Sequence, residues 1–162
     1  MKFRVSRDAL LKPLNLVAGV VERRQTLPVL SNVLLNLDGK HLSITGTDLE
    51  VELVGRITLE ESGENGEITV PARKLADICK SLSDGSELEV SVSEGKATVR
   101  SGRSRFTLST LPAREFPNIE DSIGTHQFTL QQGQLRRLID RTGFAMAHQD
   151  VRYYLNGMFW EL

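Results

Sequence analysis

The sequence predicts an α+β fold built from a repeated unit, in which a short strand leads into a helix and three further strands follow. Two observations support this prediction. Apolar residues recur in the same register in three stretches of the chain, and each of the first two helical stretches is followed by short segments typical of strands. A unit of this size cannot bury its own apolar face, so its copies are expected to pack against one another.

The first copy opens with Phe3 and Val5 on a short strand, and a helix is expected over residues 6–17 with Leu10 on its apolar side. Asp38 and Gly39 are typical of a hairpin turn. Three strands are therefore expected around and after this turn, at residues 33–37, 41–44 and 49–53.

The second copy repeats this order, with Ile68, Val70 and Leu75 in the places of Phe3, Val5 and Leu10. Its helix is expected over residues 71–82, and its three strands at 87–92, 97–99 and 105–108. A glycine precedes the last strand in both copies, Gly46 in the first and Gly102 in the second. The third copy has a strand at 128–130 and a helix at 131–144, and is cut off before its remaining strands.

Residues 116–124 contain proline, glycine and acidic residues without any apolar period, as expected of a linker. We therefore expect residues 1–124 to form a first domain of two copies and residues 125–162 to begin a second domain. Two copies together give an antiparallel sheet layer with two helices on one face, which is an α+β arrangement.

The composition is that of a globular protein, with 40% apolar and 25% charged residues among 162. No apolar run approaches the length of a transmembrane helix, and Met1 leads directly into the first strand without a signal peptide. A cytoplasmic protein with no membrane partner is expected. The single Cys79 lies on the apolar side of the second helix, where a buried structural thiol is expected.

Charge is distributed unevenly between the helices and the rest of the chain. The three predicted helices carry eight basic and three acidic residues, whereas the remainder carries twelve basic and eighteen acidic residues. Exposed helix faces often collect lysine and arginine, but the same bias in three successive helices favours a surface that attracts an anionic partner such as nucleic acid.

Evidence for catalysis is weak. Asp48, Glu50 and Glu52 alternate along a predicted strand, which is expected to be a solvated face with Leu49, Val51 and Leu53 buried behind it; the alternative is the metal site of a nuclease. The three histidines lack ligand spacing, and no phosphate-binding glycine motif or nucleophile elbow occurs. A binding protein without metal or cofactor is expected.

Two segments are richer in polar and aromatic residues than the fold requires. The strand at 105–108 would place Arg105 and Thr107 on one face and Phe106 and Leu108 on the other; it is either an edge open to another chain or simply the last strand of the core. Residues 147–157 hold both tyrosines of the chain. These rings either stack on bases or lie in the core and at its rim.

Four motifs together resemble the bacterial sliding clamp family, the beta subunits of the replicative DNA polymerase III. They lie at residues 45–50 (TGTDLE), 70–74 (VPARK), 100–112 (ending in STLP) and 146–158. The resemblance runs from Met1 to Leu162. It implies the DNA-clamp fold, a head-to-tail ring homodimer around duplex DNA, and no enzymatic activity. The partners it implies are double-stranded DNA and primer-template, bound without sequence specificity, and the clamp loader and DNA polymerases, bound through short peptide motifs.

The resemblance also implies three groups of site residues in this sequence. The DNA-contacting group is Arg24, Gln149, Tyr153 and Tyr154, with Arg73 and Arg137 as weaker candidates. The protomer interface is Lys74, Ile78, Arg103, Arg105, Phe106 and Leu108. One wall of the groove for partner peptides is Arg152 and Leu155.

Length is the main departure from the family, whose members are more than twice as long. The chain is therefore expected to be an N-terminal fragment that cannot close a ring and binds peptide motifs poorly. Two other classes of function are compatible with the sequence. One is a monomeric protein-interaction module, and the other, with less support, is a metal-dependent nuclease.

Overall fold

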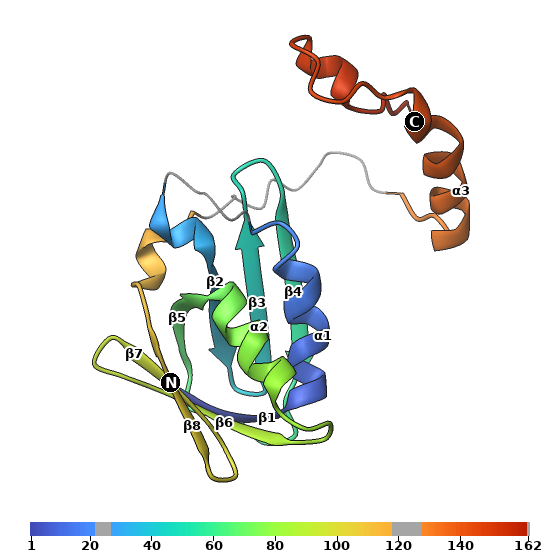
Figure 1. Cartoon of the computed structure of the whole chain (residues 1–162). Coiled ribbons are helices and arrows are strands. Elements are labelled where there is room, and N and C mark those ends of the chain that lie inside the picture. Colours follow the sequence, from blue (N-terminus) through green and yellow to red (C-terminus); the bar gives the residue numbers. More distant parts are fainter. Residues whose placement is uncertain (22–26, 118–127, 162) are drawn as a thin grey trace. The chain divides into compact units, whose positions relative to one another are not determined.

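A computed structural model describes residues 1–21, 27–117 and 128–161 of the chain. The chain divides into two compact units, Met1–Glu120 and Asp121–Leu162, which are described separately. The first unit contains eight strands and two helices among its described residues (Figure 1). Its first half comprises β1 (Lys2–Ser6), α1 (Arg7–Val17), β2 (Asn32–Asp38), β3 (His41–Thr47) and β4 (Glu52–Thr58). Its second half comprises β5 (Gly66–Pro71), α2 (Ala72–Ser81), β6 (Glu87–Ser93), β7 (Lys96–Ser101) and β8 (Ser104–Ser109).

The predicted order of strand, helix and three strands is thus present twice. Two short 3-10 helices accompany it, η1 (Pro28–Ser31) before β2 and η2 (Ala113–Glu115) after β8. The strands form two four-stranded antiparallel sheets, in the orders β1-β6-β7-β8 and β4-β3-β2-β5.

The two halves exchange their first strands. Phe3 of β1 lies opposite Val90 of β6, so the opening strand of the first half extends the sheet of the second half. In the same way, Val70 of β5 lies opposite Val33 of β2. Each sheet therefore contains strands from both copies, and neither copy can complete its sheet without the other.

Local signals in the sequence explain where α1 begins. The Ser6 hydroxyl accepts a hydrogen bond from the Ala9 amide at 3.3 Å, which caps the helix, and Asp8 lies in the first turn, where the helix dipole favours an acidic residue. Pro13 lies inside this helix and lacks the amide that would continue its hydrogen bonds. Its ring instead lies against Gly55 of β4, where a β-carbon would come within 2.6 Å of the Pro13 Cβ.

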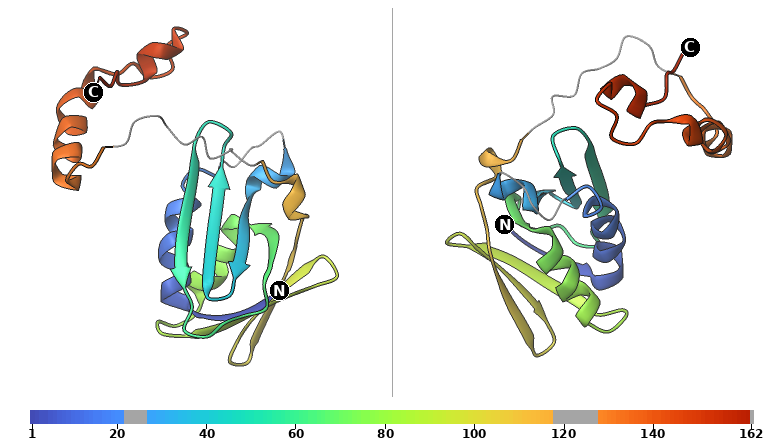
Figure 2. Two further views of the ribbon diagram at one scale, coloured as in Figure 1. Left: turned by 180° about the vertical axis from the view of Figure 1, so that it is seen from behind. Right: turned by 45° about the horizontal axis from the view of Figure 1, so that its top comes forward.

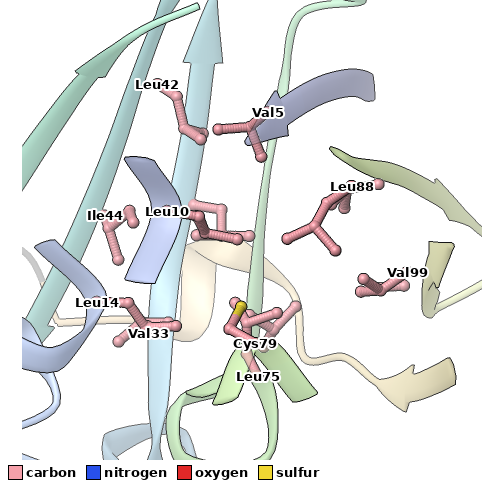
Figure 3. Packing of buried hydrophobic residues seen from close by; sticks show 14 of the residues in the cluster. Val5, Leu10, Leu14, Val33, Leu42, Ile44, Leu75, Cys79, Leu88 and Val99 are labelled. Carbon is pink, nitrogen blue, oxygen red and sulfur yellow. The ribbon is translucent and has the colours of Figure 1, made fainter. Parts of the chain in front are cut away.

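The two helices lie side by side and share one apolar core with both sheets (Figures 1 and 2). Leu10 and Leu14 of α1 and Leu75 and Cys79 of α2 are at most 2% exposed. Figure 3 shows these side chains meeting Val33 from one sheet and strand residues of the other. Burying one leucine side chain contributes roughly 1.5–3 kcal/mol, so this cluster is the main source of stability for the first unit.

The strand predicted at 49–53 was wrong for residues 49–51. Asp48 accepts hydrogen bonds from the Glu50 and Val51 amides at 2.9 and 2.7 Å, which makes a turn and lowers the pKa of the Asp48 carboxyl. Leu49 has a φ of 79°, which no strand residue adopts. Strand β4 therefore begins only at Glu52, and the leucines and valine expected to be buried are 38–53% exposed. Gly46 also lies within β3 rather than after it.

The predicted linker also begins too early. Phe116 is 6% exposed and packs with Val29 and Leu30 in a small second cluster, because η1 and η2 bring these two segments together. Residues 118–124 of the predicted linker lie outside the described residues.

In the second unit, the helix predicted at 131–144 forms as α3 (Gln132–Thr142), followed by the 3-10 helices η3 (Gly143–Ala145) and η4 (Tyr153–Asn156). The strand predicted at 128–130 is absent. A strand needs a partner, and the described residues of this unit contain no second strand with which it could pair. The apolar residues of α3 are correspondingly uncovered, with Leu138 57% and Ile139 39% exposed.

Candidate nucleic-acid and protein interfaces

Strand β8 ends its sheet on the side away from β1, so it is an edge strand in the described part of the chain. The alternation predicted for it is present: Phe106 is half-buried and Leu108 buried, while Arg105 and Thr107 are exposed. Arg103 follows Gly102, whose φ of 55° suits the tight turn between β7 and β8. An exposed edge with free main-chain groups is suited to pairing with another chain.

Helix α2 packs beside this edge, and it carries the other two residues of the predicted protomer interface. Lys74 is exposed, whereas Ile78 is 8% exposed and belongs to the core cluster. The fold therefore brings α2 and β8 together, but Ile78 reaches the surface only by a small part of its side chain.

The basic character of the first two helices is carried by four exposed side chains, Lys12 on α1 and Arg73, Lys74 and Lys80 on α2. Arg7 does not contribute in the same way. Its guanidinium donates to the Cys79 carbonyl at 3.0 Å and pairs with Asp8 and with Asp84, so its charge is neutralised within the domain. Arg73 lies at 3.5 Å from the Val21 carbonyl oxygen through its Nη2 atom. Arg24 lies outside the described residues.

On α3, Arg136, Arg137 and Arg141 are all exposed. Arg136 lies 3.6 Å from Asp140 one turn later, whereas Arg137 has no ion pair among the described residues. An exposed pair of this kind contributes little stability, so these side chains are free to respond to an anion.

In the second unit, side chains within residues 149–156 are joined by several hydrogen bonds. Arg152 donates to Asp150 through both Nε and Nη2, each at 3.0 Å. Asn156 accepts a hydrogen bond from the Asp150 amide at 3.0 Å and donates one to the Asp150 carbonyl at 3.1 Å. Asp150 thus joins the start of this segment to its end.

This arrangement displays both tyrosines on the surface. Tyr153 and Tyr154 are 83% and 68% exposed, and their rings meet edge to face with centroids 6.0 Å apart. The alternative that placed one of them in the core is therefore wrong for this structure. Gln149, also exposed, precedes Asp150 with a φ of 59°. Leu155 is 36% exposed, and its amide donates to the Arg152 carbonyl at 2.9 Å.

Sequence reasoning overlooked Asp150 and Asn156, which hold the predicted residues in place. The available signal was their residue type, because Asp and Asn side chains readily bond to nearby main-chain groups in turns.

The carboxylates considered for a metal site do not form one. Asp48 is used in the turn described above, and Glu50 is exposed beside it. In residues 1–21, 27–117 and 128–161, no three His, Cys, Asp or Glu side chains are placed to hold a metal ion. No helix in the described ranges has the length and apolar character needed to cross a membrane.

Comparison with known proteins gives a consistent result over the whole chain. Residues 1–120 match the family model for the N-terminal domain of the DNA polymerase III beta subunit, and residues 129–162 match the model for its central domain. The beta sliding clamp of Pseudomonas aeruginosa is 67% identical over 162 residues, which are 100% of this chain and 44% of that protein. The beta sliding clamp of Escherichia coli K12 is 55% identical over 161 residues, or 99% of this chain and 44% of that protein.

Solved structures agree with the fold. The DNA polymerase III subunit beta of Pseudomonas aeruginosa superposes with a TM-score of 0.94 at 67% identity, covering 98% of this chain and 43% of that one. The Caulobacter crescentus pol III beta structure gives a TM-score of 0.91 at 41% identity, covering 97% and 42%. This chain thus spans less than half the length of its relatives, and its fold is the DNA-clamp fold that the sequence resemblance predicted. The chain belongs to the DNA polymerase III beta subunit family, the bacterial sliding clamps.

Proposed function

We propose that this chain is the N-terminal part of a non-catalytic sliding clamp, which encircles duplex DNA as a head-to-tail ring homodimer and tethers replicative DNA polymerases. The observation that carries the proposal is the match to sliding clamps over all 162 residues. In this proposal residues 1–124 are the first clamp domain and residues 125–162 begin the second. A role in bacterial replication would place the protein in the cytoplasm.

Charge placement supports this function. Lys12, Arg73 and Lys80 are exposed on two adjacent helices. Exposed cations attract the phosphate backbone without reading bases, so duplex DNA can be held loosely and still slide. Tethering then raises the effective concentration of a polymerase at the primer end, which requires no chemical step by the clamp itself.

The three groups of site residues have separate roles in this proposal. Arg24, Gln149, Tyr153 and Tyr154 contact DNA, with Arg73 and Arg137 contributing charge. Lys74, Ile78, Arg103, Arg105, Phe106 and Leu108 join protomers, because β8 offers an edge and α2 lies beside it. Arg152 and Leu155 line the groove for peptide motifs of the clamp loader and polymerases.

A chimera tests the DNA-contacting group in a protein of full length. In it, this chain replaces the matching 162 residues of the Pseudomonas aeruginosa clamp. We expect Arg24→Ala combined with Tyr154→Ala to weaken binding to primed DNA and to flatten its salt dependence, because each lost phosphate contact lowers the slope by about 0.9.

The matched control is Lys96→Ala, which removes an exposed cation at the start of β7 rather than from a helix. This variant should bind DNA like the parent chimera. If the Arg24 and Tyr154 double variant bound DNA with the same salt dependence as the parent chimera, the assignment of these residues would be contradicted. Equal losses in the double variant and the control would instead indicate a general charge effect.

A further inference from the structure

A pocket of about 490 Å³ lies between β1 and the chain that leaves β4. Arg4 and Ser6 line it from β1, and Thr58, Glu60 and Glu61 line it from the end of β4 and the segment that follows. Both strands are edges, each of a different sheet. The segment that follows β4 runs back along β1 (Figure 2). Among the described residues, one main-chain bridge joins the two, between Lys2 and Glu64. The pocket therefore occupies a seam where the two sheets approach without pairing.

On the side of β1 that faces the pocket, main-chain groups are free to form hydrogen bonds. The Val92 amide donates to the Met1 carbonyl and the Arg7 amide to the Ser86 carbonyl, so the odd-numbered residues of β1 bond toward β6. The main-chain amides and carbonyls of the even-numbered residues point toward the seam instead. Lys2 exchanges two hydrogen bonds with Glu64 there, at 3.2 and 2.8 Å. Arg4 comes next along this edge, and no described residue bonds to its amide or its carbonyl.

The chemistry of the lining points to a cationic ligand with apolar parts. Val5, Leu59 and Leu88 are buried and form apolar lining. The charged part of the lining has more carboxylates than guanidinium groups. The four carboxylates belong to Glu60, Glu61, Glu87 and Glu89, and the two guanidinium groups to Arg4 and Arg100. Glu89 forms ion pairs with Lys2 and Arg4, at 3.4 and 3.6 Å. The other three carboxylates have no ion pair among the described residues.

We propose that this pocket binds an extended peptide segment of a partner protein, which pairs with the free edge of β1 at Arg4 and places a lysine or arginine against Glu60 and Glu61. Addition of a strand to an open sheet edge supplies main-chain hydrogen bonds, and the neighbouring pocket supplies side-chain specificity. The volume lies within the usual range of ligand sites, about 300–1,000 Å³. The surplus of carboxylates repels phosphate, so this pocket is not a second DNA site.

The Lys40 ammonium donates to the Glu60 carbonyl at 2.7 Å and thereby fixes the wall opposite β1. Glu60 and Glu61 therefore stand on a segment anchored to the turn between β2 and β3, and the ligand does not need to order them first. A wall fixed in advance lowers the entropic cost of binding.

The experiment titrates the ¹⁵N-labelled chain with the acetylated, amidated pentapeptide Val-Lys-Val-Lys-Val and follows amide shifts by NMR. We expect shifts at Arg4, Thr58 and Glu61, and an affinity about tenfold lower in E60K/E61K. The matched control E94K reverses an exposed charge in the turn between β6 and β7 and should bind like the parent. The milder E60Q/E61Q should weaken binding in the same direction without reversing charge.

A second probe carries N-methyl groups on alternate amides, which removes donors to the β1 edge but keeps both lysines. It should bind more weakly than the parent peptide. Shifts confined to other parts of the chain, equal affinity in E60K/E61K and E94K, or equal affinity of the two probes would each overturn the proposal. None of the described residues proposed for DNA contact lines this pocket, so either result leaves the clamp function to be judged separately.

Discussion

Arg152 binds Asp150 with two parallel hydrogen bonds, Nε to Oδ1 and Nη2 to Oδ2, both 3.0 Å long. The same carboxyl accepts a bond from the Arg152 amide at 2.8 Å. Together these bonds lower the pKa of Asp150, because they favour its charged form. Two residues of the proposed peptide groove and two tyrosines proposed to contact DNA lie within or beside the turn that this pair begins. One carboxylate thus orders residues from both proposed sites.

Asp150→Ala should disturb both sites at once. Without its carboxylate, Arg152 is released and the turn at Tyr153–Asn156 loses its anchor. In the chimera with the Pseudomonas aeruginosa clamp, we expect lower affinity for primed DNA and for a polymerase-derived peptide, both measured by fluorescence anisotropy. Asp140→Ala is the control, because among the described residues this carboxylate forms an ion pair with exposed Arg136 alone. Loss of one affinity with the other unchanged would show that Asp150 does not order both groups.

Gly55→Ala should destabilise the first unit. An added β-carbon would meet the Pro13 ring at 2.6 Å, and neither a rigid ring nor a strand can move aside easily. Overpacking of this kind costs about 1–3 kcal/mol, measured as a lower urea midpoint by circular dichroism. Gly133→Ala on α3 is the control, since nothing lies within 4 Å of its β-carbon position. An unchanged midpoint in Gly55→Ala would show that α1 and β4 are less closely packed than described.

Cys79 should resist alkylation in the folded protein. It is fully buried, and burial raises the pKa of its thiol to about 11. At pH 8 we expect iodoacetamide to label the chain only after unfolding in guanidinium chloride. Because the unfolded thiol ionises near pH 9, stability should fall as the pH rises from about 9 to 11, at no more than about 1.4 kcal/mol per pH unit.

Cys79→Ala is the matched variant for this titration. It should flatten that part of the stability profile, although it also lowers stability at every pH by leaving a small cavity. Rapid labelling of the native chain at pH 8 would contradict the burial of Cys79.

Phe106→Ala should weaken protomer pairing in the chimera. Phe106 lies half-buried on the edge strand β8, where another chain would cover it. We expect the light-scattering mass to shift from dimer toward monomer. Thr107→Ala changes the exposed opposite face of the same strand and should leave the mass unchanged. If Phe106→Ala remained fully dimeric at low concentration, β8 would not be the protomer interface.

Periodicity alone predicted much of this fold. Helix α2 was expected over residues 71–82 and forms over Ala72–Ser81, because Leu75, Ala76 and Cys79 mark its buried face clearly. The alternation in β8 was equally informative, with Phe106 and Leu108 toward the core. The exchange of β1 and β5 between sheets could not be predicted, since apolar alternation says which face is buried but does not identify the neighbouring strand.

The errors have local causes. The segment at 48–53 alternates like a strand throughout, but the Asp48 side chain bonds to two following amides and makes a turn of residues 48–51, so the strand begins only at Glu52. For the candidate site, residue types led to the tyrosines and to Arg152, whereas the roles of Asp150 and Asn156 depend on contacts between residues six positions apart. The pocket beside β1 could not be predicted either, because it is formed by two sheets whose relative placement is a tertiary property.

The most direct test of the sliding-clamp proposal is topological. The chimera is loaded by a clamp loader onto a singly nicked circular DNA, separated from free protein by gel filtration at high salt, and the DNA is then cut once with a restriction enzyme. If the protein encircles DNA, it should remain on the circle and be lost from the linear product, because only an open end lets a ring slide off. Equal retention on circular and linear DNA would contradict the proposal, since it would indicate binding by direct contact rather than by encirclement.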